Sequence, residues 1–160
     1  MPGPQPPTPL SFYSASFEYY NDDILALLDG AAKELLSAPG TGKAYGVLAV
    51  VLTADCTAGA YTFTGTPLVE IVCEGATGAL LGGTIAEDAA DAYPLFSNGG
   101  SEKITTSLRG KWADGGDGSP TATYENKALQ LEILGPPTGL GGGGAGNTLQ
   151  VTVLYTIVDV

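Results

Sequence analysis

Residues 148–158 read TLQVTVLYTIV, and this stretch decides how the rest of the chain is interpreted. Its apolar side chains recur at every second position and share one face of an extended chain: Leu149, Val151, Val153, Tyr155 and Ile157. Gln150, Thr152 and Thr156 lie on the other face. A period of two is typical of a β-strand with one buried face and one polar face. The stretch therefore predicts a strand of an antiparallel sheet.

Six further segments upstream are short, apolar and extended in character. Turn sequences such as TGTP, GATG, SNGG and DGGDG separate them, and they cover residues 47–53, 60–64, 68–73, 79–85, 103–108 and 127–134. About seven strands at this spacing are typical of a sandwich or a jelly roll. We therefore expect a mainly β protein, an antiparallel β-sandwich of jelly-roll type.

One segment near the N-terminus has helical spacing instead. Asn21, Asp22 and Asp23 supply N-cap chemistry and negative charge in the first turn. The apolar residues that follow are spaced mainly three and four apart: Ile24, Leu25, Leu28, Ala32, Leu35 and Leu36. The pattern predicts one amphipathic helix over about residues 22–37, ended by Pro39 and Gly40, with a break near Gly30 as the alternative.

The first nine residues contain five prolines, which favour an extended, polyproline-like arm. Such an arm is ordered only when its own domain or a neighbour holds it, and we favour a neighbour. Five aromatic residues follow within ten positions, which is typical of an interface, or of a hydrophobic lid over one end of the sandwich. The predicted partner-binding residues are Pro2, Pro4, Pro6, Pro7 and Pro9, anchored by Phe12, Tyr13 and Phe17.

The length of 160 residues fits one domain. We expect residues 1–20 to form an extended arm and aromatic segment. Residues 21–160 are expected to form a single β-sandwich domain that includes the helix.

The charge balance narrows the classes of partner. Six Lys and Arg residues against 17 Asp and Glu residues give a net charge of −11, so nucleic acid and anionic membrane are disfavoured as partners. The chain has no histidine, which excludes Ser-His-Asp, Cys-His and HExxH sites. We therefore expect neither enzymatic activity nor a cofactor.

The two cysteines and the apolar runs add expectations about the compartment. Cys56 and Cys73 are too few for a disulfide framework, and two buried thiols in adjacent strands are favoured over a disulfide. The N-terminal sequence does not fit a signal peptide, and the longest apolar run, residues 44–54, is too short to span a bilayer. We expect a soluble protein that folds where it is made.

Two glycine-containing motifs resemble nucleotide-binding loops, but neither fits one. APGTGKA, residues 38–44, has Ser37 where a phosphate-binding loop needs its first glycine and Ala44 where it needs Ser or Thr. It is interpreted as a helix-to-strand turn. GLGGGGAG, residues 139–146, precedes a strand rather than a helix, so it is interpreted as a flexible connection between the last two strands.

Two acidic clusters and the single tryptophan are weaker candidates for binding sites. Asp114 and Asp117 suit a calcium ion only in part, because the loop lacks the EF-hand spacing. The cluster of Glu87, Asp88 and Asp91 is interpreted, like the first, as a solvated loop. Trp112 is interpreted as packing against a strand, with a sugar-stacking platform as the alternative.

Four stretches together carry a family resemblance: NDDILALLDGAAKELL, YTFTGTPLVEIVCEG, LLGGTIAEDAADAYPLFSNGG and NTLQVTVLYTIVDV. In their overall sequence pattern they resemble the small accessory virion proteins of tailed bacteriophages, especially the capsid decoration or cement proteins. The resemblance implies a jelly-roll or related β-fold and a homotrimer on the outer capsid surface. It also implies that the major capsid protein is the partner and that the protein is made and assembled in the host cytoplasm.

The sequence therefore predicts a structural virion protein that decorates and stabilises a tailed-phage capsid. Two alternatives stay open. The first is a carbohydrate- or receptor-binding module of a head or tail fibre, which would use exposed tyrosines or Trp112 and the acidic loops with calcium. The second is a structural component of the neck or tail.

Overall fold

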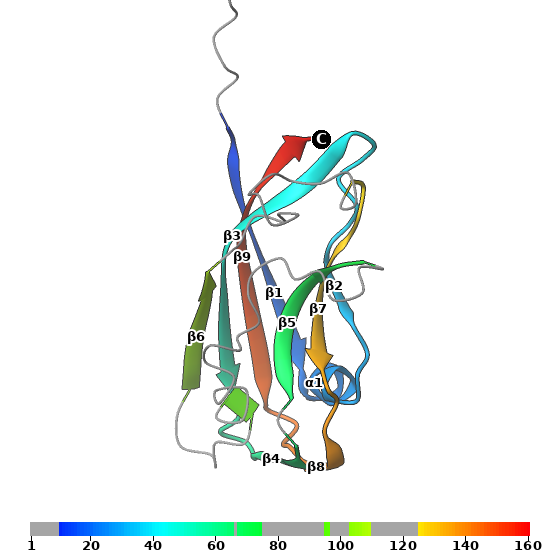
Figure 1. Ribbon diagram of the computed structural model, residues 1–160. Helices are drawn as coiled ribbons and strands as arrows, with labels where there is room; N and C mark the ends of the chain where they lie inside the picture. The colour runs from blue at the N-terminus through cyan, green and yellow to red at the C-terminus, as the bar shows by residue number, and fades with distance from the viewer. Residues whose placement is uncertain (1–9, 66, 75–94, 97–102, 110–124) are drawn as a thin grey trace, which may run out of the picture.

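Among the described residues, the longest strand pair joins β9 (Thr148–Asp159) to β3 (Lys43–Asp55). In the computed structural model, β9 lies between β1 (Phe12–Tyr20) and β3, antiparallel to both. The structure describes residues 10–65, 67–74, 95–96, 103–109 and 125–160. β6 (Lys103–Arg109) pairs with the far side of β3, so this sheet has the order β1-β9-β3-β6. Figure 1 shows the long β9 flanked by its partners.

A second sheet contains three strands in the order β2-β7-β5. β7 (Leu129–Leu134) is central, with β2 (Lys33–Leu36) on one side and β5 (Leu68–Cys73) on the other. A short third sheet pairs β4 (Tyr61–Thr64) with β8 (Thr138–Gly142) at the base of the molecule in Figure 1.

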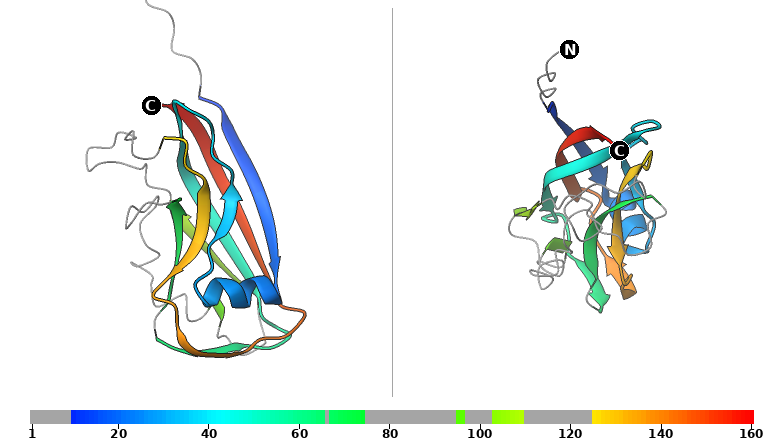
Figure 2. Two further views of the ribbon diagram at one scale, coloured as in Figure 1. Left: turned by 90° about the vertical axis from the view of Figure 1, so that its right-hand side faces the viewer. Right: turned by 45° about the horizontal axis from the view of Figure 1, so that its top comes forward.

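The core lies between the two larger sheets, which face each other in Figure 2. The four-stranded sheet contributes Val151 and Leu52, which stand side by side in register, and the three-stranded sheet contributes Ile71 and Leu131 in the same way. All four are buried because alternate residues of each strand point inward. The prediction of a mainly β, antiparallel sandwich is confirmed, whereas jelly-roll connectivity stays a prediction.

The helix is shorter than its apolar spacing predicts. α1 spans Asn21–Leu28 and buries Ile24, Leu27 and Leu28. The prediction of a helix to about residue 37 is wrong, because Gly30 adopts φ +94°, which an α-helix cannot continue through. The chain then becomes extended and forms β2, in which Leu35 is buried. APGTGKA therefore connects strand β2 to strand β3, and the expected helix-to-strand turn is wrong.

The glycine-rich segment before β9 is also more regular than predicted. Thr138–Gly142 forms β8 and pairs with β4, so this part of the expected flexible connection is a strand. A Cβ on Gly142 would stand 2.5 Å from the Ala60 carbonyl oxygen, which only glycine tolerates. The run thus permits two backbones to approach closely.

Most other predicted strands agree with the structure to within a few residues at each end. Cys56 and Cys73 are buried free thiols, as expected, and the alternative disulfide is not formed. Cys56 follows β3 and Cys73 ends β5, which belong to different sheets, so the expectation of adjacent strands is wrong. The predicted strand 79–85 lies outside the described residues, as do Trp112, Asp114, Asp117, Glu87, Asp88 and Asp91. In the part of the chain described, no helix is long and apolar enough to cross a membrane.

Candidate functional site

The predicted partner-binding residues fall into two groups. The prolines Pro2, Pro4, Pro6, Pro7 and Pro9 lie outside the described residues. Phe12, Tyr13 and Phe17 all belong to β1, which is an edge strand of the four-stranded sheet. In the left view of Figure 2, β1 runs along one margin of the molecule. The three anchors therefore stand on a surface strand of the sandwich.

Alternation along β1 divides the anchors between two faces. Phe12 points outward and exposes 59% of its surface, and Tyr13 exposes 46%. Phe17 is only partly exposed, because it stands opposite Val151 of β9 and packs against the core. Phe12 and Tyr13 are thus available to a partner, while Phe17 fixes the strand to its own domain.

The first residues of β1 are attached to the sheet by an aromatic row. The ring of Tyr13 stacks on Tyr155 with centroids 5.6 Å apart, and Tyr45 meets Tyr155 edge-on at 5.5 Å. The Thr156 hydroxyl also donates a hydrogen bond to the Ser11 carbonyl at 2.8 Å. These contacts hold residues 11–13 in place without any partner. Tyr45 and Tyr155 were not among the predicted site residues, although the position of Tyr155 on the apolar face of its strand was predicted.

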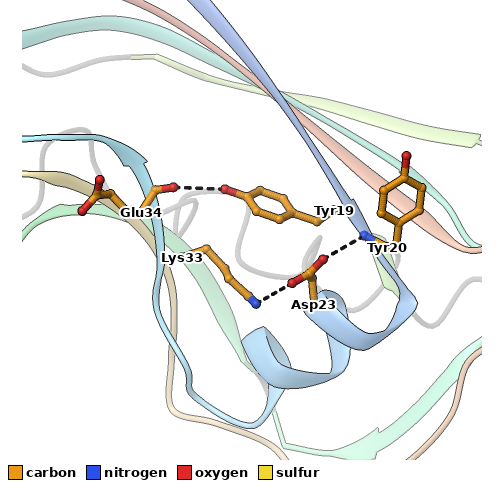
Figure 3. Close-up of polar contacts among 5 residues, drawn as sticks. All are labelled: Tyr19, Tyr20, Asp23, Lys33 and Glu34. Carbon is orange, nitrogen blue, oxygen red and sulfur yellow. Dashed lines mark hydrogen bonds and ion pairs between the residues drawn. The ribbon is translucent and has the colours of Figure 1, made fainter.

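The other end of β1 is fixed by a polar cluster, shown in Figure 3. The Asp23 carboxylate accepts a 2.7 Å hydrogen bond from Lys33 Nζ and a 3.4 Å bond from the Tyr20 backbone N–H. The hydrogen bond from Lys33 is the main reason why the pKa of Asp23 is lowered. The Tyr19 hydroxyl donates to the Glu34 carbonyl at 3.4 Å, which joins β1 to β2 across the two sheets.

Tyr20 itself is directed away from this cluster and exposes 57% of its surface. Its hydroxyl donates to the Glu18 carboxylate at 2.9 Å, and this bond is the main cause that raises the pKa of Tyr20. An open hollow beside it is lined by Tyr20, Asn21, Asp22, Asp23 and Ala145. Of the described residues that line the hollow, two are acidic and none is basic, which suits a neutral or cationic contact rather than a phosphate.

The outward face of the four-stranded sheet is rich in hydroxyl groups. Ser16 and Thr152 share a hydrogen bond of 2.9 Å across β1 and β9, and Thr53 and Thr105 share one of 3.1 Å across β3 and β6. Within the described ranges, no three or more metal-ligating side chains gather closely enough to hold an ion. The described part of this face offers a partner contact area and hydroxyl groups.

Comparison with known proteins finds matches among solved structures. No protein-family model matches the chain, and no curated protein does. The chain is similar to a chain of the cyanophage Pam1 capsid asymmetric unit at 16% identity and a TM-score of 0.40, over 98% of this chain and 91% of that one. It is also similar to a chain of the acid-stable capsid of Helicobacter pylori bacteriophage KHP30 at 15% identity and a TM-score of 0.40, over 93% and 92%. A likeness at this level carries no argument about what the chain binds.

Proposed function

We propose that the protein is a structural component of a tailed-phage virion, a decoration protein that binds the major capsid protein on the outer capsid surface and stabilises it. The observation that carries the proposal is the aromatic edge strand β1, whose exposed Phe12 and Tyr13 directly follow the proline-rich segment. The proposed contact residues therefore lie within one short stretch of sequence, from Pro2 to Tyr13. The resemblance of the sequence to cement proteins points in the same direction.

In this proposal, the proline-rich segment binds the capsid in an extended form and is anchored at one end by β1. Prolines restrict the unbound segment and so reduce the entropy lost when it becomes ordered on a partner. Phe12 and Tyr13 are already held by β1, so binding them requires little further ordering. A surface of net charge −11 also keeps a densely decorated particle from adhering to others.

The oligomer that fits this role is a homotrimer, in which three such segments engage the capsid together. Repetition raises the effective affinity without any new contact. We expect the trimer to be made and assembled in the host cytoplasm and to remain on the virion. Light scattering on the purified protein measures its oligomeric state.

Deletion of residues 1–10 tests the proposed contact. The deletion stops before Ser11, whose carbonyl accepts the bond from Thr156, so β1 keeps its attachment. We expect an unchanged thermal transition and at least about tenfold weaker co-sedimentation with purified capsids, because the arm supplies much of the contact.

A second variant, F12S/Y13S, removes the exposed anchors and is expected to weaken binding in the same assay. Leu154→Ser is the matched control, because Leu154 is an exposed apolar residue on β9 rather than on β1. Full binding by the truncated protein would reject the arm as the contact.

The number of copies per particle tests the decoration role itself. Quantitative mass spectrometry against the major capsid protein should give hundreds of copies in a simple ratio. About a dozen copies or fewer would assign the protein to the neck or tail instead.

A further inference from the structure

The sequence of β1, FYSASFEYY, is self-complementary about its central residue, Ser16. When two such strands pair antiparallel around Ser16, the numbers of any two opposite residues add up to 32. The resulting pairs are Phe12 with Tyr20, Tyr13 with Tyr19, Ser14 with Glu18, Ala15 with Phe17, and Ser16 with itself. Aromatic residues thus meet aromatic residues, which is among the favourable cross-strand combinations.

The edge of β1 lacks the devices that normally prevent such pairing. Edge strands are commonly protected by lysine, proline, a bulge or short length. β1 is nine residues long, pairs with β9 without a register shift, and contains neither lysine nor proline. Its single charge is Glu18. Among the described residues, β9 is the only strand that pairs with β1, so the backbone at the other edge of β1 is a template for another strand.

The exposure of the aromatic residues matches this pairing. The most exposed rings of β1 are at its two ends, Phe12 at 59% and Tyr20 at 57%. Both lie on the outward face, together with Ser14, Ser16 and Glu18. A twofold axis through Ser16 brings each exposed phenylalanine against an exposed tyrosine of the other copy. One symmetric contact would cover both ends.

We propose that the β1 strands of two copies pair antiparallel around a twofold axis at Ser16, so that the sheets join into one of eight strands. Such an interface is isologous, because residue i meets residue j and residue j meets residue i. The two Glu18 carboxylates do not face each other, since each stands opposite Ser14, and this matters in a chain of net charge −11. The proposal does not depend on the capsid role. Because both contacts use Phe12, the β1 pair is a contact of protein that is not bound to a capsid.

Cysteine cross-linking tests the register of the pair. Ser16→Cys places two thiols directly opposite each other, within the Cα separation that a disulfide requires. Ser14→Cys is the matched control on the same face, because two copies of residue 14 would lie about 14 Å apart, four residues along the strand. Both native thiols are buried and should not compete. Mild oxidation of the full chain should give a covalent dimer for S16C and none for S14C.

Lysine substitutions test the same contact without covalent cross-linking. Ser16→Lys puts two positive charges opposite each other and should raise the dissociation constant of the dimer at least about fivefold. Ser14→Lys places the same charge opposite Glu18 and should leave the dimer as tight or tighter. Sedimentation equilibrium of the full chain measures both. Equal effects of the two lysines, cross-linking of both cysteine variants or of neither, or a wild-type chain with no twofold contact would overturn the proposal.

Discussion

Gly143 shows how one residue fixes the base of the sandwich. It adopts φ +81°, and a Cβ there would collide with the Tyr61 ring and stand 2.8 Å from Asn21 Oδ1. The Tyr61 hydroxyl donates to that same Asn21 oxygen at 2.9 Å. Gly143 therefore lets the chain pass close to a partly buried hydrogen bond that joins α1 to β4.

Gly143→Ala should lower the free energy of unfolding by about 2–4 kcal/mol, from the strain of a positive φ and the collision with Tyr61. Gly139→Ala is the matched control, because Gly139 has φ +65° but a Cβ there would have nothing within 4 Å. It should cost only about 1 kcal/mol, since the backbone strain acts alone. Urea denaturation measures both values. Equal losses would show that the contact with Tyr61 is unimportant.

Among the elements, the pair β5 and β7 carries an unusual juxtaposition. Glu70 of β5 stands directly opposite Glu132 of β7. Glu70 is only 4% exposed, and its Oε1 has no hydrogen-bond partner among the described residues. Burial raises the pKa of Glu70, and the charge of Glu132 raises it further.

A raised pKa makes the folded state hold its proton longer than the unfolded state does. Below the unfolded pKa of about 4.3 both states are protonated and Glu70 carries no penalty. As pH rises from there towards the folded pKa, the unfolded state releases its proton first, so the fold loses stability, and the full loss persists above the folded pKa. Glu70→Gln should therefore increase the free energy of unfolding by about 1 kcal/mol at pH 7.5 relative to wild type. The increase should largely disappear near pH 4.

Thermal melts of wild type and E70Q across this pH range measure the difference. Glu132→Gln is the control for charge alone and should give a smaller gain, because Glu132 is only half-buried. A constant difference between E70Q and wild type at all pH values would contradict the assignment.

The elements also show which parts of the fold were predictable. The alternation of apolar residues predicts a strand over residues 148–158, which matches β9 to within one residue. This part was predictable because a period of two is a local property of the sequence. Leu35 and Leu36 fit a helical period equally well, and only the turn at Gly30 assigns them to β2. β8 was missed because glycines have no side chains from which to read a pattern.

For the candidate site, the sequence located the aromatic segment but not the role of each ring. Whether Phe12 or Phe17 points inward depends on the register of β1 with β9, a pairing between residues far apart in the chain. The position of β1 at the edge of its sheet depends on the order of all four strands. Neither the direction of each ring nor the edge position of β1 can be predicted from neighbouring residues in the sequence.

At the scale of the whole molecule, the two thiols report on the integrity of the sandwich. Cys56 directly follows β3 of one sheet, Cys73 ends β5 of the other, and both are buried in one core. Burial raises the pKa of each to about 11. Both thiols are therefore protected only while the two sheets remain together.

At pH 8, a thiol reagent such as dithionitrobenzoate should react with neither cysteine of the folded protein, or at least about a hundredfold more slowly than with a free thiol. In strong urea it should react with two. The loss of protection should coincide with the unfolding transition seen by circular dichroism. Fast reaction of one thiol under native conditions would show that its sheet opens separately.

The place of β9 between β1 and β3 has a consequence for synthesis on the ribosome. Ser16 of β1 and Thr152 of β9 are bonded across 136 residues of sequence. At common translation rates, the emerging β1 waits on the order of ten seconds for that partner. During this time both edges of an aromatic strand are open, so the nascent chain is the form of the protein most in need of a chaperone. Folding of the four-stranded sheet is therefore a late event whose speed is set by long-range pairing.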